Sequence, residues 1–147
     1  MRSIAIFTAG LVVALTVAGC AKSSSSTNAS ETAAAETAAA AGGPGEKVYA
    51  TNCSSCHQAD GKGLAGSFPP LAHNPTVTGD PTKVIRIVKF GLTGKIEVQG
   101  HAFNGIMPPW GSQLSNADIA AAVTYIRASF GNSAGAVTEA QVAAVAK

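Results

Sequence analysis

The chain has 147 residues, of which 46% are hydrophobic, and its ten basic and eight acidic side chains give a formal net charge of +2 at pH 7. This near-neutral balance lacks the strong positive field that attracts nucleic-acid phosphates, so we expect no nucleic-acid partner. Three cysteines are too few for a disulfide-rich scaffold, and the length allows one domain once the N-terminal segments are set aside.

Residues 1–19 have the pattern of a lipoprotein signal peptide. Arg2 precedes an uncharged, largely apolar run from Ile4 to Gly19, which is shorter than the roughly 20 residues of a membrane span and suits the core of a secretory signal. The run ends in TVAGC, which resembles the lipobox of bacterial lipoproteins. That resemblance implies lipidation of Cys20, which would become the mature N-terminus. An ordinary signal peptide that leaves an idle thiol, or a retained membrane anchor, is the alternative.

The next segments divide by composition. Residues 20–45 contain no large apolar side chain, so they cannot bury enough surface to offset the chain entropy of folding, and we expect a disordered tether. Residues 46–131 carry the folded domain. Residues 132–147 form a tail in which a short helix can begin at Thr138, and the sequence assigns this tail no role.

The sequence CSSCH at residues 53–57 is a c-type haem attachment pattern. Cys53 and Cys56 lie on one turn of chain, so their thiols can form thioethers with the two vinyl groups of one haem, and His57 is then placed to ligate the iron. A redox-active CxxC and half of a zinc site are the competing interpretations. A thioredoxin-like site requires a βαβ context that is absent, and a structural zinc ion requires four ligands.

Met107 is the candidate for the sixth iron ligand. It is the sole methionine of the chain after the initiator, and Pro108 and Pro109 follow it, which stiffens its loop. Core filling is the alternative role for such a methionine. His73 and His101 are other possible iron ligands in principle, although a surface or structural role suits each of them better.

Several segments together resemble the class I c-type cytochromes. The resemblance covers roughly residues 45–130 and rests on Gly45, Tyr49, CSSCH, FPPLA at 68–72, NGIMPPW at 104–110 and a final amphipathic helix. It implies an all-α fold in which helices surround one covalently bound haem c, with Met107 at the axial position. It also implies that the Pro69 carbonyl orients His57, that Leu71 packs near the porphyrin, and that Trp110 either donates to a haem propionate or only packs at its edge.

The pattern predicts three main helices. The first covers residues 46–53, the second begins after Asp80 with Pro81 at its first position and ends at Gly91, and the third begins with a Ser115–Asp118 capping box. Residues 94–105 contain alternation and glycine, so a loop or a short hairpin is expected there.

These features predict an electron carrier and not an enzyme, because ligation on both sides leaves no open iron position. We expect it to be lipid-anchored on the periplasmic side of a bacterial membrane and to exchange electrons with redox proteins such as a membrane complex, oxidase, reductase or dehydrogenase. The alternatives are a cytochrome subunit of a quinoprotein dehydrogenase or terminal reductase complex and, from a different class, a haem peroxidase or gas sensor.

Overall fold

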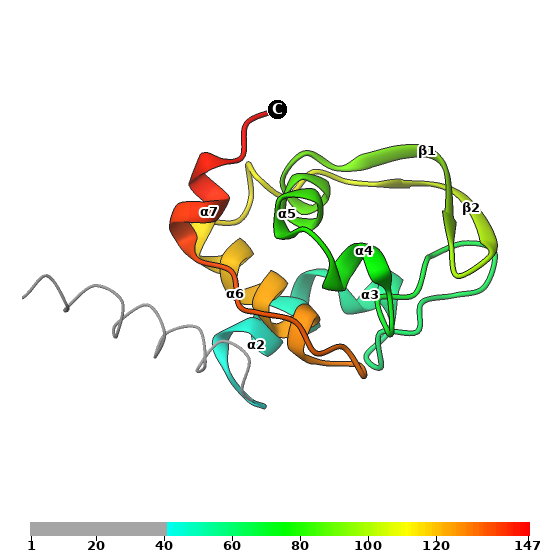
Figure 1. Ribbon diagram of the computed structural model, residues 1–147, viewed down its shortest axis with the longest axis horizontal. Helices are drawn as coiled ribbons and strands as arrows, with labels where there is room; N and C mark the ends of the chain where they lie inside the picture. The colour runs from blue at the N-terminus through cyan, green and yellow to red at the C-terminus, as the bar shows by residue number, and fades with distance from the viewer. Residues whose placement is uncertain (1–40) are drawn as a thin grey trace, which may run out of the picture.

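The computed structural model describes residues 41–147, so the predicted signal peptide, Cys20 and most of the tether lie outside the described residues. The described part consists of six helices and one two-stranded antiparallel sheet (Figure 1). In chain order the elements are α2 (Pro44–Asn52), α3 (Ser54–His57), α4 (Pro75–Thr78), α5 (Pro81–Phe90), β1 (Leu92–Val98), β2 (His101–Met107), α6 (Asn116–Ala128) and α7 (Glu139–Ala144).

The helix ends follow the capping residues that the sequence indicates. The Asp80 side chain accepts from the backbone N–H of Thr82 at the start of α5, and Gly91 ends that helix with φ +78°. Ser115 and Asp118 form a capping box at the start of α6. Helix α6 ends at Ala128, and the chain then leaves the helical direction through two residues with positive φ.

Helices α2 and α6 cross each other through an aromatic cluster. Tyr49 from α2 lies 5.6 Å from Tyr125 and 5.1 Å from Phe130 between ring centroids, and the Tyr125–Phe130 pair is T-shaped. Gly45 and Tyr49 are the buried residues of α2. Both residues are among those on which the resemblance to the class I c-type cytochromes rests.

The all-α class needs correction at residues 92–107, which form a β-hairpin that extends away from α5 (Figure 1), the hairpin being one of the two structures expected for residues 94–105. The two strands pair in register from Leu92 with Met107 to Val98 with His101. Side-chain exposure alternates along β1, as expected for a strand with one covered face. Alternating exposure favours a hairpin over a helix in this segment. The turn residues Gln99 and Gly100 favour it too, because both have a positive φ.

The C-terminal tail packs into the same core as α5 and α6. Val137, Val142 and Val145 are buried in a cluster with residues of both helices. The Lys89 ammonium donates to the carbonyls of Val142 at 2.7 Å and Val145 at 2.8 Å, at the C-terminal end of α7. Residues 132–147 are thus a structural part of the domain, which the sequence pattern did not reveal.

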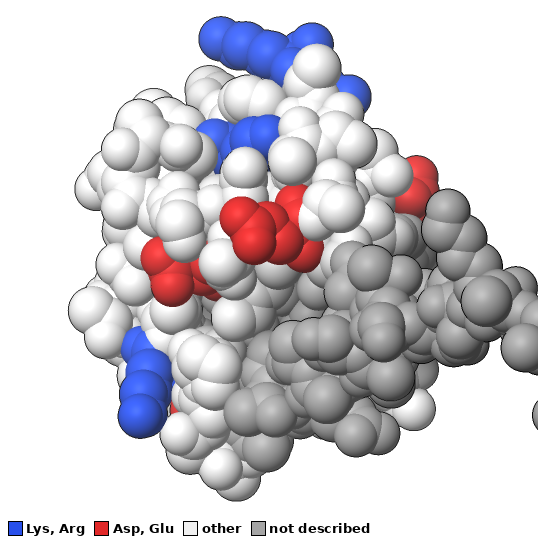
Figure 2. All heavy atoms as spheres, turned by 90° about the vertical axis from the view of Figure 1, so that its left-hand side faces the viewer, with Lys and Arg blue, Asp and Glu red and all other residues white. Residues whose placement is uncertain are grey.

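The surface on the α7 side carries charges of both signs. Figure 2 shows lysine or arginine and aspartate or glutamate groups on this face, and neither kind forms a continuous patch on it. Within residues 41–147 no helix has the length and apolar character needed to cross a membrane.

Candidate functional site

The CxxCH segment forms a single tight turn at the end of α2. The Cys53 N–H donates to the carbonyl of Tyr49 at 2.9 Å, and Cys53 also begins α3, because its carbonyl accepts from the N–H of His57 at 3.0 Å. Cys53 and Cys56 are half-buried free thiols and are not joined in a disulfide. Both sulfur atoms and the imidazole are therefore carried by one short, hydrogen-bonded turn.

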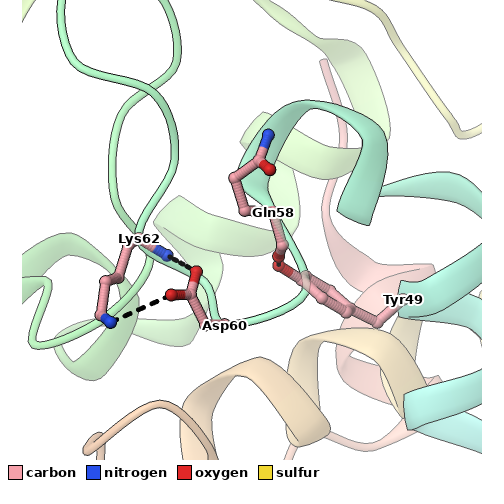
Figure 3. Close-up of polar contacts among 4 residues, drawn as sticks. All are labelled: Tyr49, Gln58, Asp60 and Lys62. Atoms are coloured by element: carbon pink, nitrogen blue, oxygen red, sulfur yellow. Dashed lines mark hydrogen bonds and ion pairs between the residues drawn. The ribbon is translucent and has the colours of Figure 1, made fainter.

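The chain after His57 is held by a buried phenol. Gln58 has φ +65°, a left-handed conformation that is uncommon for a residue with a side chain. The Tyr49 hydroxyl donates to the Gln58 carbonyl at 2.5 Å (Figure 3), and burial is the main cause that raises the pKa of Tyr49, so the hydroxyl stays protonated as a donor. Two residues further along the chain, Asp60 forms an ion pair with Lys62, with 3.0 Å between the carboxylate oxygen and the ammonium nitrogen (Figure 3). The sequence pattern did not reveal the hydrogen bond of the Tyr49 hydroxyl.

His57 is oriented by the carbonyl that the sequence indicated. Its Nδ1 atom lies 3.0 Å from the Pro69 oxygen, and because a carbonyl can only accept, Nδ1 carries the proton. The side chain is only 8% exposed, and burial lowers the pKa of His57 despite the opposing effect of the Pro69 bond. The imidazole is therefore neutral, and its Nε2 lone pair is free to bind a metal.

The thiols do not have the properties of a redox-active pair. Burial, and secondarily Cys56, raises the pKa of the Cys53 thiol to about 11, whereas reactive CxxC cysteines need a lowered thiol pKa. Within residues 41–147 no group of three or more His, Cys, Asp and Glu side chains is arranged to hold a metal ion. These findings argue against the redox-active and zinc interpretations of the CxxCH segment.

Met107 and the cysteine turn pack against different apolar clusters. Met107 is the last residue of β2 and packs with Trp110 against the apolar cluster of α5, α6 and the tail. Cys53 and Leu71 pack instead against a second cluster, formed by Tyr49, Val77 and Ile126. The structure thus groups the predicted site residues into two sets, Cys53, His57, Pro69 and Leu71 in one, and Met107 and Trp110 in the other.

The loop after Met107 is tied to the end of α5. The Trp110 N–H donates to the Val88 carbonyl and the Gly111 N–H to the Lys89 carbonyl, both at 3.0 Å. A Cβ atom at Gly91 would lie 2.6 Å from the Met107 carbonyl oxygen, so only glycine allows this close approach. The base of the hairpin, and with it the backbone of Met107, is therefore held firmly against α5.

The covered face of the hairpin suits a flat apolar group. By strand alternation this face carries Met107 with its partner Leu92, and Phe103 with its partner Ile96. Between these two pairs lies Gly94 opposite Gly105, where a Cβ atom would meet no atom closer than 3.5 Å. The hairpin thus offers a thioether and apolar side chains around a strip without side chains, which fits an apolar cofactor edge.

Comparisons with known proteins identify the family of the chain. The family described as "Cytochrome C oxidase, cbb3-type, subunit III" matches residues 40–126. Cytochrome c-552 of Thermus thermophilus is 39% identical over 92 residues, which cover 60% of this chain and 69% of that protein.

The chain belongs to the class I c-type cytochromes.

Other relatives of this cytochrome are named as parts of dehydrogenases. The cytochrome c subunit of alcohol dehydrogenase (quinone) from Gluconacetobacter polyoxogenes is 41% identical over 102 residues, which cover 67% of this chain and 21% of that protein. The gluconate 2-dehydrogenase cytochrome c subunit of Pantoea cypripedii is 40% identical over 108 residues, covering 70% and 24% respectively. This cytochrome therefore spans between a fifth and a quarter of the length of these dehydrogenase subunits.

Family membership establishes the cofactor and the general role. The cytochrome binds one covalent haem c and carries electrons. The neutral His57 with a free Nε2 atom, the two free thiols on its turn and the Met107 thioether fit this group.

Proposed function

We propose that Cys53, Cys56, His57 and Met107 hold the haem of this cytochrome, the cysteines through thioethers and the other two as axial iron ligands. The observation that carries the proposal is the hydrogen bond of 3.0 Å from His57 Nδ1 to the Pro69 carbonyl, which fixes the tautomer with Nε2 free on the same turn as both thiols. A bond of this kind orients a ligating imidazole and increases its basicity. Leu71 and Trp110 would border the porphyrin on the two sides.

When bound, the haem supplies one-electron oxidation and reduction at its iron. His57 contributes a fixed imidazole, because its ring cannot rotate without breaking the bond to Pro69. Met107 contributes a thioether, a ligand that raises the reduction potential relative to a second histidine. If both side chains ligate the iron as proposed, no position on the metal would be left for a substrate, and the protein would transfer electrons without binding one there.

A dehydrogenase is the electron donor that the relatives support best. Three kinds of relative are named as cytochrome subunits of alcohol, gluconate and fructose dehydrogenases. The matched family carries the name of a terminal oxidase subunit, which supports an oxidase as electron acceptor. We therefore infer that this cytochrome takes single electrons from a dehydrogenase, as a subunit or as a separate partner, and passes them toward an oxidase.

The proposed location rests on the N-terminal sequence. Cleavage before Cys20 and lipidation of its thiol would anchor the protein, and the residues between Cys20 and Pro44 would serve as the tether, because the predicted tether of residues 20–45 overlaps helix α2 at Pro44 and the buried Gly45. Attachment of c-type haem outside the cytoplasm is consistent with a periplasmic position.

A rapid-mixing experiment tests the electron donor. The oxidised cytochrome is mixed with ethanol and a quinone-dependent alcohol dehydrogenase from which the cytochrome subunit has been removed. We expect one electron to be taken up per haem, at a rate that rises with the dehydrogenase concentration, and no reduction without ethanol. If a chemical reductant reduces the haem but the dehydrogenase does not, the proposed donor is wrong while the carrier role stands.

The ligand set is tested by the spectrum of the oxidised protein. We expect low-spin iron with the weak far-red absorption of a methionine–iron bond. The Met107→Ala variant should lose that band and bind carbon monoxide when reduced. A high-spin spectrum in the unaltered protein would rule out Met107 as the sixth ligand and would favour the peroxidase or sensor alternative.

A further inference from the structure

Within residues 41–147, the hairpin of β1 and β2 makes few hydrogen bonds to the rest of the domain, although Val98 and Phe103 are buried on its covered face. Its base is held through Gly91, whose N–H donates to the Ile87 carbonyl at 2.9 Å, and through the Trp110 bond to α5. Among residues 41–147, the hydrogen bonds that join residues 92–106 to the rest of the domain all come from the Gln99 side chain. Its amide nitrogen donates to the carbonyl of Ala72 at 2.8 Å and to the carbonyl of His73 at 3.1 Å.

Gln99 is an unusual residue for its position in the turn. Val98 and His101 close a two-residue turn in which Gln99 has φ +53° and Gly100 has φ +78°. A turn with two positive φ angles favours asparagine, aspartate or glycine at the first position. Glutamine gains nothing in backbone conformation there, but its longer side chain reaches the carbonyls of the neighbouring segment.

The other side of this contact has the same kind of backbone conformation. His73 has φ +50°, which is also uncommon for a residue that is not glycine, and its carbonyl accepts from Gln99. Such backbone strain persists only where the surrounding structure enforces it, and it tends to occur at functional contacts. Gln99 on the hairpin tip and His73 on the neighbouring segment thus both have strained backbone conformations where they contact each other.

The two segments that Gln99 joins carry opposite sides of the proposed haem site. Ala72 and His73 lie three and four residues after Pro69, whose carbonyl orients His57, and the hairpin ends at Met107. Between the loop of residues 62–70 and β2 lies a cavity of about 290 Å³, lined in part by Phe68, Pro70 and Phe103. Within the protein itself, the loop and the strand thus face each other across a cavity, and Gln99 joins the two segments that continue from them.

We propose that Gln99 is a positioning residue that holds the hairpin closed and thereby keeps Met107 in place. Breaking its two hydrogen bonds would leave the tip of the hairpin held by the packing of Val98 and Phe103 alone, so that the tip would move away from the 68–73 segment more often. The frequency of such opening would then set how fast an outside ligand replaces Met107. This inference rests on the proposed ligand set, in which Met107 binds the iron.

The Gln99→Asn variant separates the side-chain reach from the turn conformation. Asparagine suits the turn at least as well as glutamine, but its amide is shorter by one carbon, about 1.5 Å, and cannot reach both carbonyls from the same backbone position. The control is Gln141→Ala, which removes another glutamine amide, the one that accepts from the Thr138 N–H at 2.8 Å at the start of α7. That site is in the C-terminal tail, outside the hairpin.

Two measurements on the haem-loaded protein test the proposal. The first is the rate at which excess imidazole abolishes the methionine–iron band of the oxidised protein, and the second is the backbone hydrogen exchange of residues 92–106. In Gln99→Asn we expect imidazole entry to be roughly tenfold faster, the effect of losing about one net hydrogen bond, together with faster exchange along the hairpin. Gln141→Ala should change neither, although it should lower the unfolding midpoint.

Two outcomes overturn the proposal. If Gln99→Asn and the unaltered protein agree within about twofold in imidazole rate and hydrogen exchange, Gln99 does not hold the hairpin. If Gln141→Ala accelerates imidazole entry as much as Gln99→Asn does, the rate follows general stability. A methionine–iron band that is already missing in the unaltered protein would instead disprove the ligand set proposed above.

Discussion

The Tyr49→Phe substitution removes one buried oxygen atom next to the haem attachment turn. The phenylalanine ring can keep the packing with Tyr125 and Phe130, so the lost interaction is the hydrogen bond of 2.5 Å to the Gln58 carbonyl. Because that carbonyl loses its partner in a part-buried position, we expect the free energy of unfolding at pH 8 to fall by about 1.5 kcal/mol. Gln58 would also be freer to leave its left-handed conformation directly after His57.

The same substitution should change how stability depends on pH. Burial raises the pKa of Tyr49 in the folded protein above the ordinary value of about 10 that applies in the unfolded chain. Below that value both states are protonated and Tyr49 adds no pH dependence. Above it only the unfolded state loses the proton, so the unaltered protein loses about 1.4 kcal/mol of stability per pH unit that Tyr49→Phe does not lose. The two proteins should therefore become equally stable near pH 11, about one unit above the unfolded pKa.

The assay is guanidinium unfolding of the reduced protein, followed by far-ultraviolet circular dichroism at pH 8, 10 and 11. Tyr125→Phe is the matched control, because it removes the same atom from the same aromatic cluster, and no hydrogen bond to that hydroxyl occurs within residues 41–147. We expect the control to lose less than Tyr49→Phe at pH 8. A stability difference between Tyr49→Phe and the unaltered protein that stays constant up to pH 11 would refute the buried, protonated phenol.

Further predictions concern the tail, the iron ligand and the anchor. Lys89→Met should lower the free energy of unfolding by about 2 kcal/mol, because it removes both bonds to the end of α7, whereas Lys83→Met on the exposed face of α5 should have little effect in the same denaturant titration. Val142→Ala, at a fully buried position, should cost about 2 kcal/mol without changing the haem spectrum. Met107→Ala should lower the reduction potential, measured by redox titration; an unchanged potential would exclude a Met107–iron bond. Cys20→Ser should move the haem protein from the membrane fraction to the soluble fraction, and retention of the variant in membranes would contradict the lipid anchor.

Much of the site could be predicted from the sequence because it depends on local spacing. The CxxCH turn places two thiols and an imidazole within five residues, and this arrangement needs no knowledge of the rest of the fold. The same holds for the starts of α5 and α6, where a side chain caps a backbone N–H two or three residues away. The family resemblance added the Pro69 carbonyl, which the structure places 3.0 Å from His57.

Other features depend on contacts between residues far apart in the chain, and only the tertiary structure determined them. Residues 92–107 form a hairpin and not part of an all-α fold, and the alternation that shows it is interrupted by glycines, so the sequence left a loop equally possible. The tail became part of the core through Lys89, more than 50 residues before its partners in α7. Gln99 reaches Ala72 across 27 residues, and Tyr49 donates to Gln58 through a turn that reverses the chain. Side chains with one obvious chemical use can be assigned from their spacing, whereas a glutamine, a lysine or a phenol has many possible partners, and the fold alone selects which of them lies within reach.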